Sequence, residues 1–420
     1  MSSDIYIDDL INPVFSDMQK AALEFGEGLS VNLSCHSIMK EAEQKTGCSD
    51  WGENDFIERL TLLCDEWNAD DGLTGVGRFS LRNKLVQHAT SRLLIQDQFN
   101  RHPEIHDIQI EKPIIVAGLP RSGTTHLLNL MASDSRLRAL PLWESYEPVP
   151  MPGESLRKDG ADPRYKRCAD AWAMMQQVSP YLAAMHPMNP DHIHEELELM
   201  GPNFGSYNYE WLNYSPRWRD NYYAEDQAYQ YEYMRDVLKL LLWQQRDTDR
   251  PTRWVLKCPQ HLEQLPVLHK VFPDATVAIT HRDPVSVIQS AITMLAYGQR
   301  MTRRKIMAEE LLEYWTDRVE HLLDACARDR GVLPEAQSID VPFHELIRDD
   351  LGWVEKIYSK AGLEMTEQSR SELSQFVEGH RDDYGRVIYD LKGQFGVDPD
   401  DLRERFHFYY KAFPVKRARG

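Results

Sequence analysis

Apolar residues follow two different spacings, which divide the chain into two regions. Over residues 56–67 and again over 81–94, apolar side chains recur three and four positions apart, which is the spacing of one face of a helix. From residue 113 onward, short continuous apolar runs alternate with helical stretches. The pattern predicts a helical region, residues 1–110, packed on an α/β domain formed by residues 111–420.

Four of the short apolar runs are predicted β-strands because they end abruptly in glycine, proline or charged residues. They cover residues 114–117, 254–256, 276–280 and 339–343. Strands that alternate with helices form a mostly parallel sheet, covered by helices on both faces. The prediction is therefore an α/β fold of three layers, with a central and mostly parallel sheet. Ligands of such sheets bind at the carboxyl ends of the strands.

A proline-rich insertion of about residues 141–235 separates the first two predicted strands. No regular pattern runs through it, and its second half is dense in tyrosine and tryptophan. Long irregular segments inside a compact domain are usually functional. We expect the rings to form a lid with its own core, the wall of a ligand pocket, or both.

A loop with two glycines and one arginine follows the first predicted strand. Gly118 and Gly123 have the spacing of a Walker A loop, but Thr124 and Thr125 stand where that motif has lysine and a hydroxyl residue. The cation lies inside the loop, as Arg121. Loop amides and the start of a helix bind oxyanions well. The pattern predicts a phosphate site that does not hold a magnesium nucleoside triphosphate.

Charged residues also follow two later strands. Lys257 comes directly after residues 254–256, and Arg282 comes shortly after residues 276–280. Ser290 lies eight residues beyond Arg282, two turns into a predicted helix. Because the carboxyl ends of parallel strands share one edge, these side chains should face the ligand of the glycine loop.

These segments resemble the sulfotransferases that use 3′-phosphoadenosine 5′-phosphosulfate (PAPS). The loop around Arg121 resembles their 5′-phosphosulfate loop, and Arg282 followed by Ser290 resembles their 3′-phosphate motif. Trp143 with Glu144, and the run from Lys257 to His261, resemble the bacterial-type branch, which is related to tyrosylprotein and cytosolic sulfotransferases. The resemblance implies PAPS as the sulfuryl donor and a hydroxyl compound as the acceptor.

The resemblance also implies roles for the loop residues. Arg121 would be the cation over the 5′-phosphosulfate, and Lys257 would reach the transferring group. The remaining loop residues would supply amides and hydroxyls to the donor: Ser122, Gly123, Thr124 and Thr125. Sulfuryl transfer needs no magnesium clamp, and we expect no metal. The segment from Tyr389 to Gly396 lacks the continuation typical of the cytosolic family's 3′-phosphate clamp, and we interpret it as a loop.

The general base has three candidates. Glu144 ranks first because the tyrosylprotein branch carries a glutamate at the matching place. His261 ranks second, below Glu144, because its spacing from Lys257 differs from the spacing of the catalytic histidine in the cytosolic branch. His194 with Glu195 ranks third, as an imidazole next to a carboxylate. A base must first reach the proton that it removes, which a sequence does not reveal.

Composition restricts the partners. The net charge of −18 opposes binding to nucleic acid or to anionic membranes. The six cysteines have no paired spacing, which fits a reducing compartment. The sequence has no apparent targeting signal and no run of about 18 apolar residues, so we expect a cytoplasmic protein without a membrane span. The oligomeric state stays open.

Two alternatives to a sulfotransferase are considered. A nucleotide-dependent small-molecule kinase would share the loop, but it would need the Walker lysine. A sulfotransferase-like protein without turnover would bind the nucleotide only. For an active enzyme, the ring-rich insertion favours a small apolar or aromatic acceptor over an anionic polysaccharide.

Overall fold

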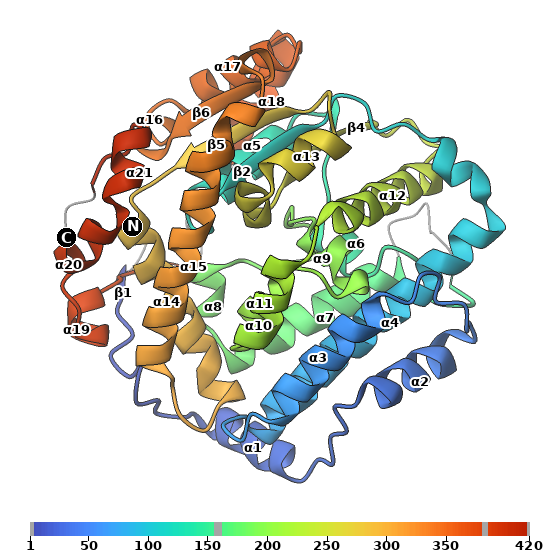
Figure 1. Cartoon of the computed structure of the whole chain (residues 1–420), viewed down its shortest axis with the longest axis vertical. Coiled ribbons are helices and arrows are strands. Elements are labelled where there is room, and N and C mark those ends of the chain that lie inside the picture. Colours follow the sequence, from blue (N-terminus) through green and yellow to red (C-terminus); the bar gives the residue numbers. More distant parts are fainter. Residues whose placement is uncertain (1–3, 155–161, 380–384, 418–420) are drawn as a thin grey trace.

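The computed structural model describes residues 4–154, 162–379 and 385–417, and it contains a parallel sheet, drawn in the upper part of Figure 1. The sheet has five strands in the order β3-β4-β2-β5-β6, and every neighbouring pair is parallel. The strands are β2 (Ile114–Gly118), β3 (Leu137–Arg138), β4 (Arg253–Lys257), β5 (Thr276–His281) and β6 (Ser338–Pro342). All four predicted strands are present. A separate pair, β1 (Asp4–Ile5) and β7 (Arg386–Val387), joins the two ends of the chain.

Helices make up most of the rest of the described chain. The region before the sheet contains α1 (Asp17–Glu27), α2 (Cys35–Thr46), α3 (Phe56–Asn68) and α4 (Gly75–Arg101). The insertion contains α6 (Leu142–Tyr146), α7 (Pro163–Val178), α8 (Leu182–Met185), α9 (Leu197–Met200), α10 (Asn208–Leu212), α11 (Pro216–Ala224) and the start of α12 (Ala228–Gln244). The body contains α5 (Thr124–Ala132), α13 (Leu265–Val271), α14 (Pro284–Thr302), α15 (Ala308–Asp329), α16 (Phe343–Leu346), α17 (Asp350–Lys360), α18 (Glu367–Gly379), α19 (Leu391–Phe395), α20 (Pro399–Arg403) and α21 (His407–Ala412).

Helices cover both faces of the sheet, which confirms the predicted three layers. Alternate residues of a strand point to opposite faces. Ile114 and Val116 pack in one apolar core with α5, α17 and α18. Ile115 and Ala117 pack in a larger core with α12, α13, α14 and α15. The glycine loop at the end of β2 therefore starts from a strand that is buried on both sides.

The N-terminal helices form a third apolar core together with the insertion. The predicted faces of α3 and α4 are buried there, and rings of the insertion such as Phe204 and Trp218 complete the core. Figure 1 shows α1–α4 along the edge of the molecule that lies away from the sheet. Among the described residues, none of the helices has both the length and the apolar character that crossing a bilayer requires.

The insertion is more helical than its proline content suggested. Pro163 and Pro216 are the first residues of α7 and α11. Proline is well suited to the first turn of a helix, because the amide hydrogen it lacks would have no partner there. These prolines therefore begin helices, and the insertion is a scaffold of short helices between the sheet and α4.

Candidate active site

The glycine loop is a tight turn with no room for a side chain at its first glycine. A Cβ atom on Gly118 would lie 2.0 Å from the Thr280 hydroxyl oxygen, so only glycine fits there. Gly123 has φ +87° and Arg121 has φ +65°, in the left-handed region that residues other than glycine rarely adopt. The Ser122 hydroxyl donates to the Leu119 carbonyl and lies 2.7 Å from Thr280 Oγ1. The turn holds the start of α5 open toward a ligand.

The two predicted phosphate motifs meet at Arg121. Its Nε donates to Ser290 Oγ at 2.9 Å, and its Nη2 donates to the Tyr389 hydroxyl at 3.1 Å. Its Nη1 donates to the Met185 carbonyl. The Arg282 guanidinium donates to the Arg121 carbonyl. Residues far apart in the sequence thus converge at one edge of the sheet.

Arg121 and Arg282 form a cationic pair that is suited to an anion. Neither guanidinium is in an ion pair with a carboxylate within the described residues. Burial lowers the pKa of Arg282, and the charge of Arg121 lowers it further. Two neighbouring cations without carboxylate partners are stabilised when an anion binds between them. The edge of the sheet therefore fits an anionic ligand.

Lys257 carries a third cation to the same edge. Its side chain is 2% exposed, and its Nζ lies 3.3 Å from Thr125 Oγ1 and in an ion pair with Glu195. Glu196, the residue after Glu195, does not bond to the ammonium; its carboxylate accepts a hydrogen bond from the backbone amide of Lys257 at 2.8 Å. A buried ammonium next to a loop hydroxyl and a carboxylate is a suitable group for charge that develops during transfer.

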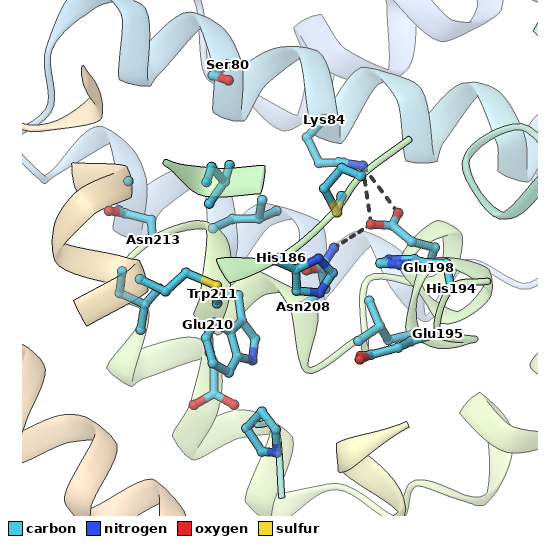
Figure 2. A pocket seen from close by; sticks show the side chains of 18 of the residues that line it. Ser80, Lys84, His186, His194, Glu195, Glu198, Asn208, Glu210, Trp211 and Asn213 are labelled. Atoms are coloured by element: carbon cyan, nitrogen blue, oxygen red, sulfur yellow. Dashed lines mark hydrogen bonds and ion pairs between the residues drawn. The ribbon is translucent and has the colours of Figure 1, made fainter. Parts of the chain in front are cut away.

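A cavity of about 610 Å³ opens beside this edge (Figure 2). Arg121, Thr124, Thr125, Lys257 and Glu195 line one part of it. Most of the remaining wall is apolar or aromatic: Leu81, Trp143, Tyr146, Met175, Leu182, Met188, Leu197, Trp211, Leu212, Tyr214, Met294, Leu295, Leu311, Tyr314 and Trp315. The size and lining are typical of a site for a small apolar ligand.

The aromatic rings of the insertion divide between the two roles expected of them. Tyr207, Tyr209 and Trp218 are buried in the apolar cores. Trp211 and Tyr214 line the cavity. The insertion is thus both a packed scaffold and a cavity wall.

Glu144, the first-ranked base, lies outside the cavity lining although its neighbour Trp143 belongs to it. The Glu144 carboxylate is buried and forms an ion pair with Arg138. The Arg138 guanidinium lies 4.7 Å from the centre of the Trp254 ring. The ion pair therefore holds the carboxylate at the edge strand β3, and this placement argues against Glu144 as the base.

His261, the second-ranked base, is fully buried with both ring nitrogens engaged. Its Nε2 lies 2.7 Å from Glu196 Oε1, and its Nδ1 lies 2.9 Å from the Tyr231 hydroxyl. The residue is not part of the cavity lining. His261 anchors Glu196, and its placement also argues against a direct role.

His194 and Glu195, ranked third, both line the cavity. Burial lowers the pKa of His194 to about 3, so its ring is neutral at pH 7. Glu195 is ion-paired with Lys257 at the loop. Of the three candidates, this is the one that lines the cavity beside the glycine loop.

Two site residues were not predicted. His186 lines the cavity, and burial holds its pKa well below the usual range, with His194, His192, Arg121 and Lys257 lowering it further. Tyr389 contacts Arg121, although its segment was interpreted only as a loop. His186 stands among prolines and methionines without a motif. For Tyr389, the incomplete likeness to a 3′-phosphate clamp was the only available signal.

Comparisons with known proteins agree with this geometry. Residues 113–367 match the model of the sulfotransferase family. The chain is similar to the solved structure of sulfotransferase STF1 from Mycobacterium tuberculosis H37Rv, with 27% identity and a TM-score of 0.77 over 91% of this chain and 100% of that one. Sulfotransferase STF9 from Mycobacterium avium is similar in fold, with 24% identity and a TM-score of 0.81 over 92% and 98% of the two chains. No curated protein sequence matches the chain.

The family match begins at the strand that precedes the glycine loop and extends past β6, so it includes every residue predicted to bind the donor. The kinase alternative and the alternative without turnover are set aside. The described residues contain no group of acidic, histidine and cysteine side chains that could hold a metal ion. The family match covers more than half of the chain, and it shows that this chain belongs to the sulfotransferase family.

Proposed function

We propose that the protein sulfates a hydroxyl group of a small, largely apolar acceptor that binds in the cavity. As a sulfotransferase, the enzyme takes the sulfuryl group from PAPS. The proposal for the acceptor rests on one observation: a single cavity extends from the glycine loop to the aromatic rings. Arg121 and Thr125 of the glycine loop line the same cavity as Trp211 and Trp315.

The donor roles follow from the positions of the cations. Arg282 and Ser290 would hold the 3′-phosphate, and Arg121 with the amides of the glycine loop would hold the 5′-phosphosulfate. The tight turn at Gly118 and the paired guanidinium groups fit this ligand. The bound donor supplies the sulfuryl group, and its phosphate leaves with increased charge. Arg121 and Lys257 would stabilise that charge.

Glu195 is the base that we propose. Its carboxylate lines the cavity beside the loop, where it forms an ion pair with Lys257. An ionised carboxylate can take the proton from the hydroxyl of the acceptor. Once the donor is bound, Lys257 would bond to the transferring group, and Glu195 would then be free to accept the proton.

His186 is the second candidate for the base. Its Nδ1 lies 3.3 Å from the Pro187 carbonyl, which favours the tautomer with the proton on that nitrogen. Nε2 would then be the acceptor. Burial keeps the ring neutral, as a base requires. Glu195 is favoured over His186 because Glu195 contacts the cation at the loop directly.

The proposed function is tested by binding and turnover together. The product nucleotide PAP should raise the melting temperature of the protein without magnesium. A panel of alcohols and phenols incubated with labelled PAPS should yield sulfated products, with apolar compounds preferred over sugars. Preferential sulfation of an anionic polysaccharide would contradict the proposed acceptor class.

Arg282→Ala should weaken PAP binding by about 2–4 kcal/mol, because it removes charge-assisted bonds to a phosphate group. Titration calorimetry with PAP measures the loss. AMP, which lacks the 3′-phosphate, is the matched control and should lose little affinity. An equal loss for AMP would mean that Arg282 acts only by holding the loop at the Arg121 carbonyl.

We also propose that the enzyme works in the cytoplasm. All six cysteines are free in the structure, and Cys64, Cys168, Cys258 and Cys326 are buried. Free thiols in this number fit a reducing compartment. Cell fractionation that found the protein outside the cytoplasm would refute this location.

A further inference from the structure

Three polar side chains form a cluster in the apolar wall of the cavity: Lys84 of α4, Glu198 of α9 and Asn208 of α10 (Figure 2). Lys84 Nζ lies 3.2 Å from Glu198 Oε2, and Asn208 Nδ2 donates to Glu198 Oε1 at 2.8 Å. The proposed binding of the donor uses none of them. They come from elements that are distant in sequence, so the fold brings them together at this wall.

Glu198 is an ionised carboxylate at the centre of the cluster. The residue is 4% exposed, and His88 Nε2 lies 3.1 Å from its Oε2. Burial alone would raise the pKa of Glu198, but Lys84 and His88 hold the pKa well below its usual range. Lys84 also lies 4.1 Å from the centre of the Tyr146 ring. The ammonium and the carboxylate compensate each other, so the cluster carries no net charge.

The carboxylate fixes the orientation of the Asn208 side chain. An ionised carboxylate only accepts hydrogen bonds, so the amide nitrogen of Asn208 must face Glu198. Within the described chain, no hydrogen bond to Asn208 Oδ1 is present, and this oxygen is available to a ligand. The second N–H of the amide is likewise uncommitted. The cluster thus offers both an acceptor and donors to the cavity.

Polar groups facing an apolar cavity lose solvation unless a ligand bonds to them. We propose that Lys84, Glu198 and Asn208 form a subsite for a second oxygen of the acceptor, which is a neutral hydroxyl or carbonyl group. This inference rests on the proposed function. A carboxylate or an ammonium at the same place would lose its own solvation and would find no uncompensated opposite charge, because Lys84 and Glu198 are already paired.

The subsite lies along the same wall as the site of transfer. The Tyr146 ring, which Lys84 contacts, lies 6.2 Å from the His194 ring, and His194 lies 5.9 Å from His186. Glu195 follows His194 in the chain and reaches Lys257. One acceptor molecule can therefore present one hydroxyl to Glu195 and a second oxygen to Asn208. The enzyme would select apolar molecules that carry two oxygen functions at a suitable separation.

The experiment measures acceptor binding to the protein saturated with PAP. The probes are octanol, decanol and dodecanol, with the terminal diols and the ω-hydroxy acids of the same lengths. At the length that spans the two sites, the diol should bind about tenfold more tightly than the alcohol, the usual gain from a hydrogen bond to a charged or oriented partner. The hydroxy acid should bind more weakly than the diol.

Variants then assign the preference to the subsite. Asn208→Leu and Lys84→Met should each abolish the tenfold preference and leave the affinity for PAP unchanged. Asn208→Leu is the safer variant for folding, because Glu198 keeps its bonds to Lys84 and His88. Met294→Ala, in the apolar wall, is the matched control and should weaken alcohol and diol alike.

The outcomes separate this inference from the proposed function. If the wild type does not bind PAP, the proposed function itself fails. If PAP binds but no diol is preferred at any length, or none of the probes binds, the subsite is refuted and the donor site stands. A full diol preference in Asn208→Leu, or tighter binding of the hydroxy acids, would also overturn the inference.

Discussion

Glu195→Gln should lower kcat by about 10²–10⁴-fold while PAP binds as in the wild type. Glutamine keeps the size of the side chain and a hydrogen bond to Lys257, but it cannot take a proton from the acceptor. The loss should shrink for acidic phenols, which ionise without a base. Single-turnover sulfation of phenols that differ in pKa measures this dependence directly.

Glu144→Gln is the matched control for this prediction. It removes the same charge from the other candidate carboxylate, which is buried against Arg138 and away from the cavity. Breaking a buried ion pair costs stability, so its melting temperature should fall while kcat per folded molecule stays close to that of the wild type. The reverse result, with Glu195→Gln fully active and Glu144→Gln inactive, would restore the ranking made from the sequence.

His186→Asn separates the two proposed bases. If Glu195 is the base, this variant should lose far less turnover than Glu195→Gln. A larger loss in His186→Asn, with PAP binding intact, would move the role to the imidazole. In that event the pH profile of kcat should also lose its acidic limb in the variant, because no imidazole would remain to protonate.

The convergence of the cationic side chains near the glycine loop could be predicted from the sequence because its signals are local. The strand, the two glycines and Arg121 lie within a few residues, and the carboxyl ends of parallel strands must share an edge. That rule alone placed Lys257 and Arg282 opposite the loop. The fold class followed from the same alternation of strands and helices.

The base could not be ranked from the sequence because reach depends on side-chain direction. Glu144 follows Trp143, which does line the cavity, but the carboxylate faces the other way, toward Arg138. Glu195 and Glu196 are neighbours, yet one pairs with Lys257 in the cavity and the other with the buried His261. A change of one position decides whether a carboxylate faces the cavity or is buried away from it, and sequence spacing does not resolve this.

The cavity wall that contains Lys84 was the least predictable part because it is built from distant segments. Lys84 belongs to the N-terminal helices, which were expected to pack on the α/β domain. Its partners Glu198 and Asn208 lie in the insertion. No local pattern links these residues, and only the packing of α4 against the insertion brings them to one cavity wall.

Arg121→Ala should lower kcat by about 10²–10³-fold, more than it lowers the affinity for PAP, because negative charge grows on the leaving phosphate in the transition state. Arg121→Lys should fail nearly as badly. The guanidinium donates in three directions, to Ser290, Tyr389 and the Met185 carbonyl, and its planar fork is what allows this. A lysine ammonium carries the same charge but lacks the planar arrangement of N–H donors. Steady-state kinetics with PAPS, beside calorimetry with PAP, measures both effects.

Tyr389→Phe is the control that removes one of the three hydrogen bonds of the Arg121 guanidinium. It removes the hydroxyl that accepts from Arg121 Nη2 at 3.1 Å and leaves the ring in place. Its loss in kcat should be well below that of Arg121→Lys, because the contacts to Ser290 and Met185 still orient the guanidinium. Wild-type turnover in Arg121→Lys would show that charge alone is sufficient at this position. The left-handed backbone at Arg121 would then serve only to shape the loop.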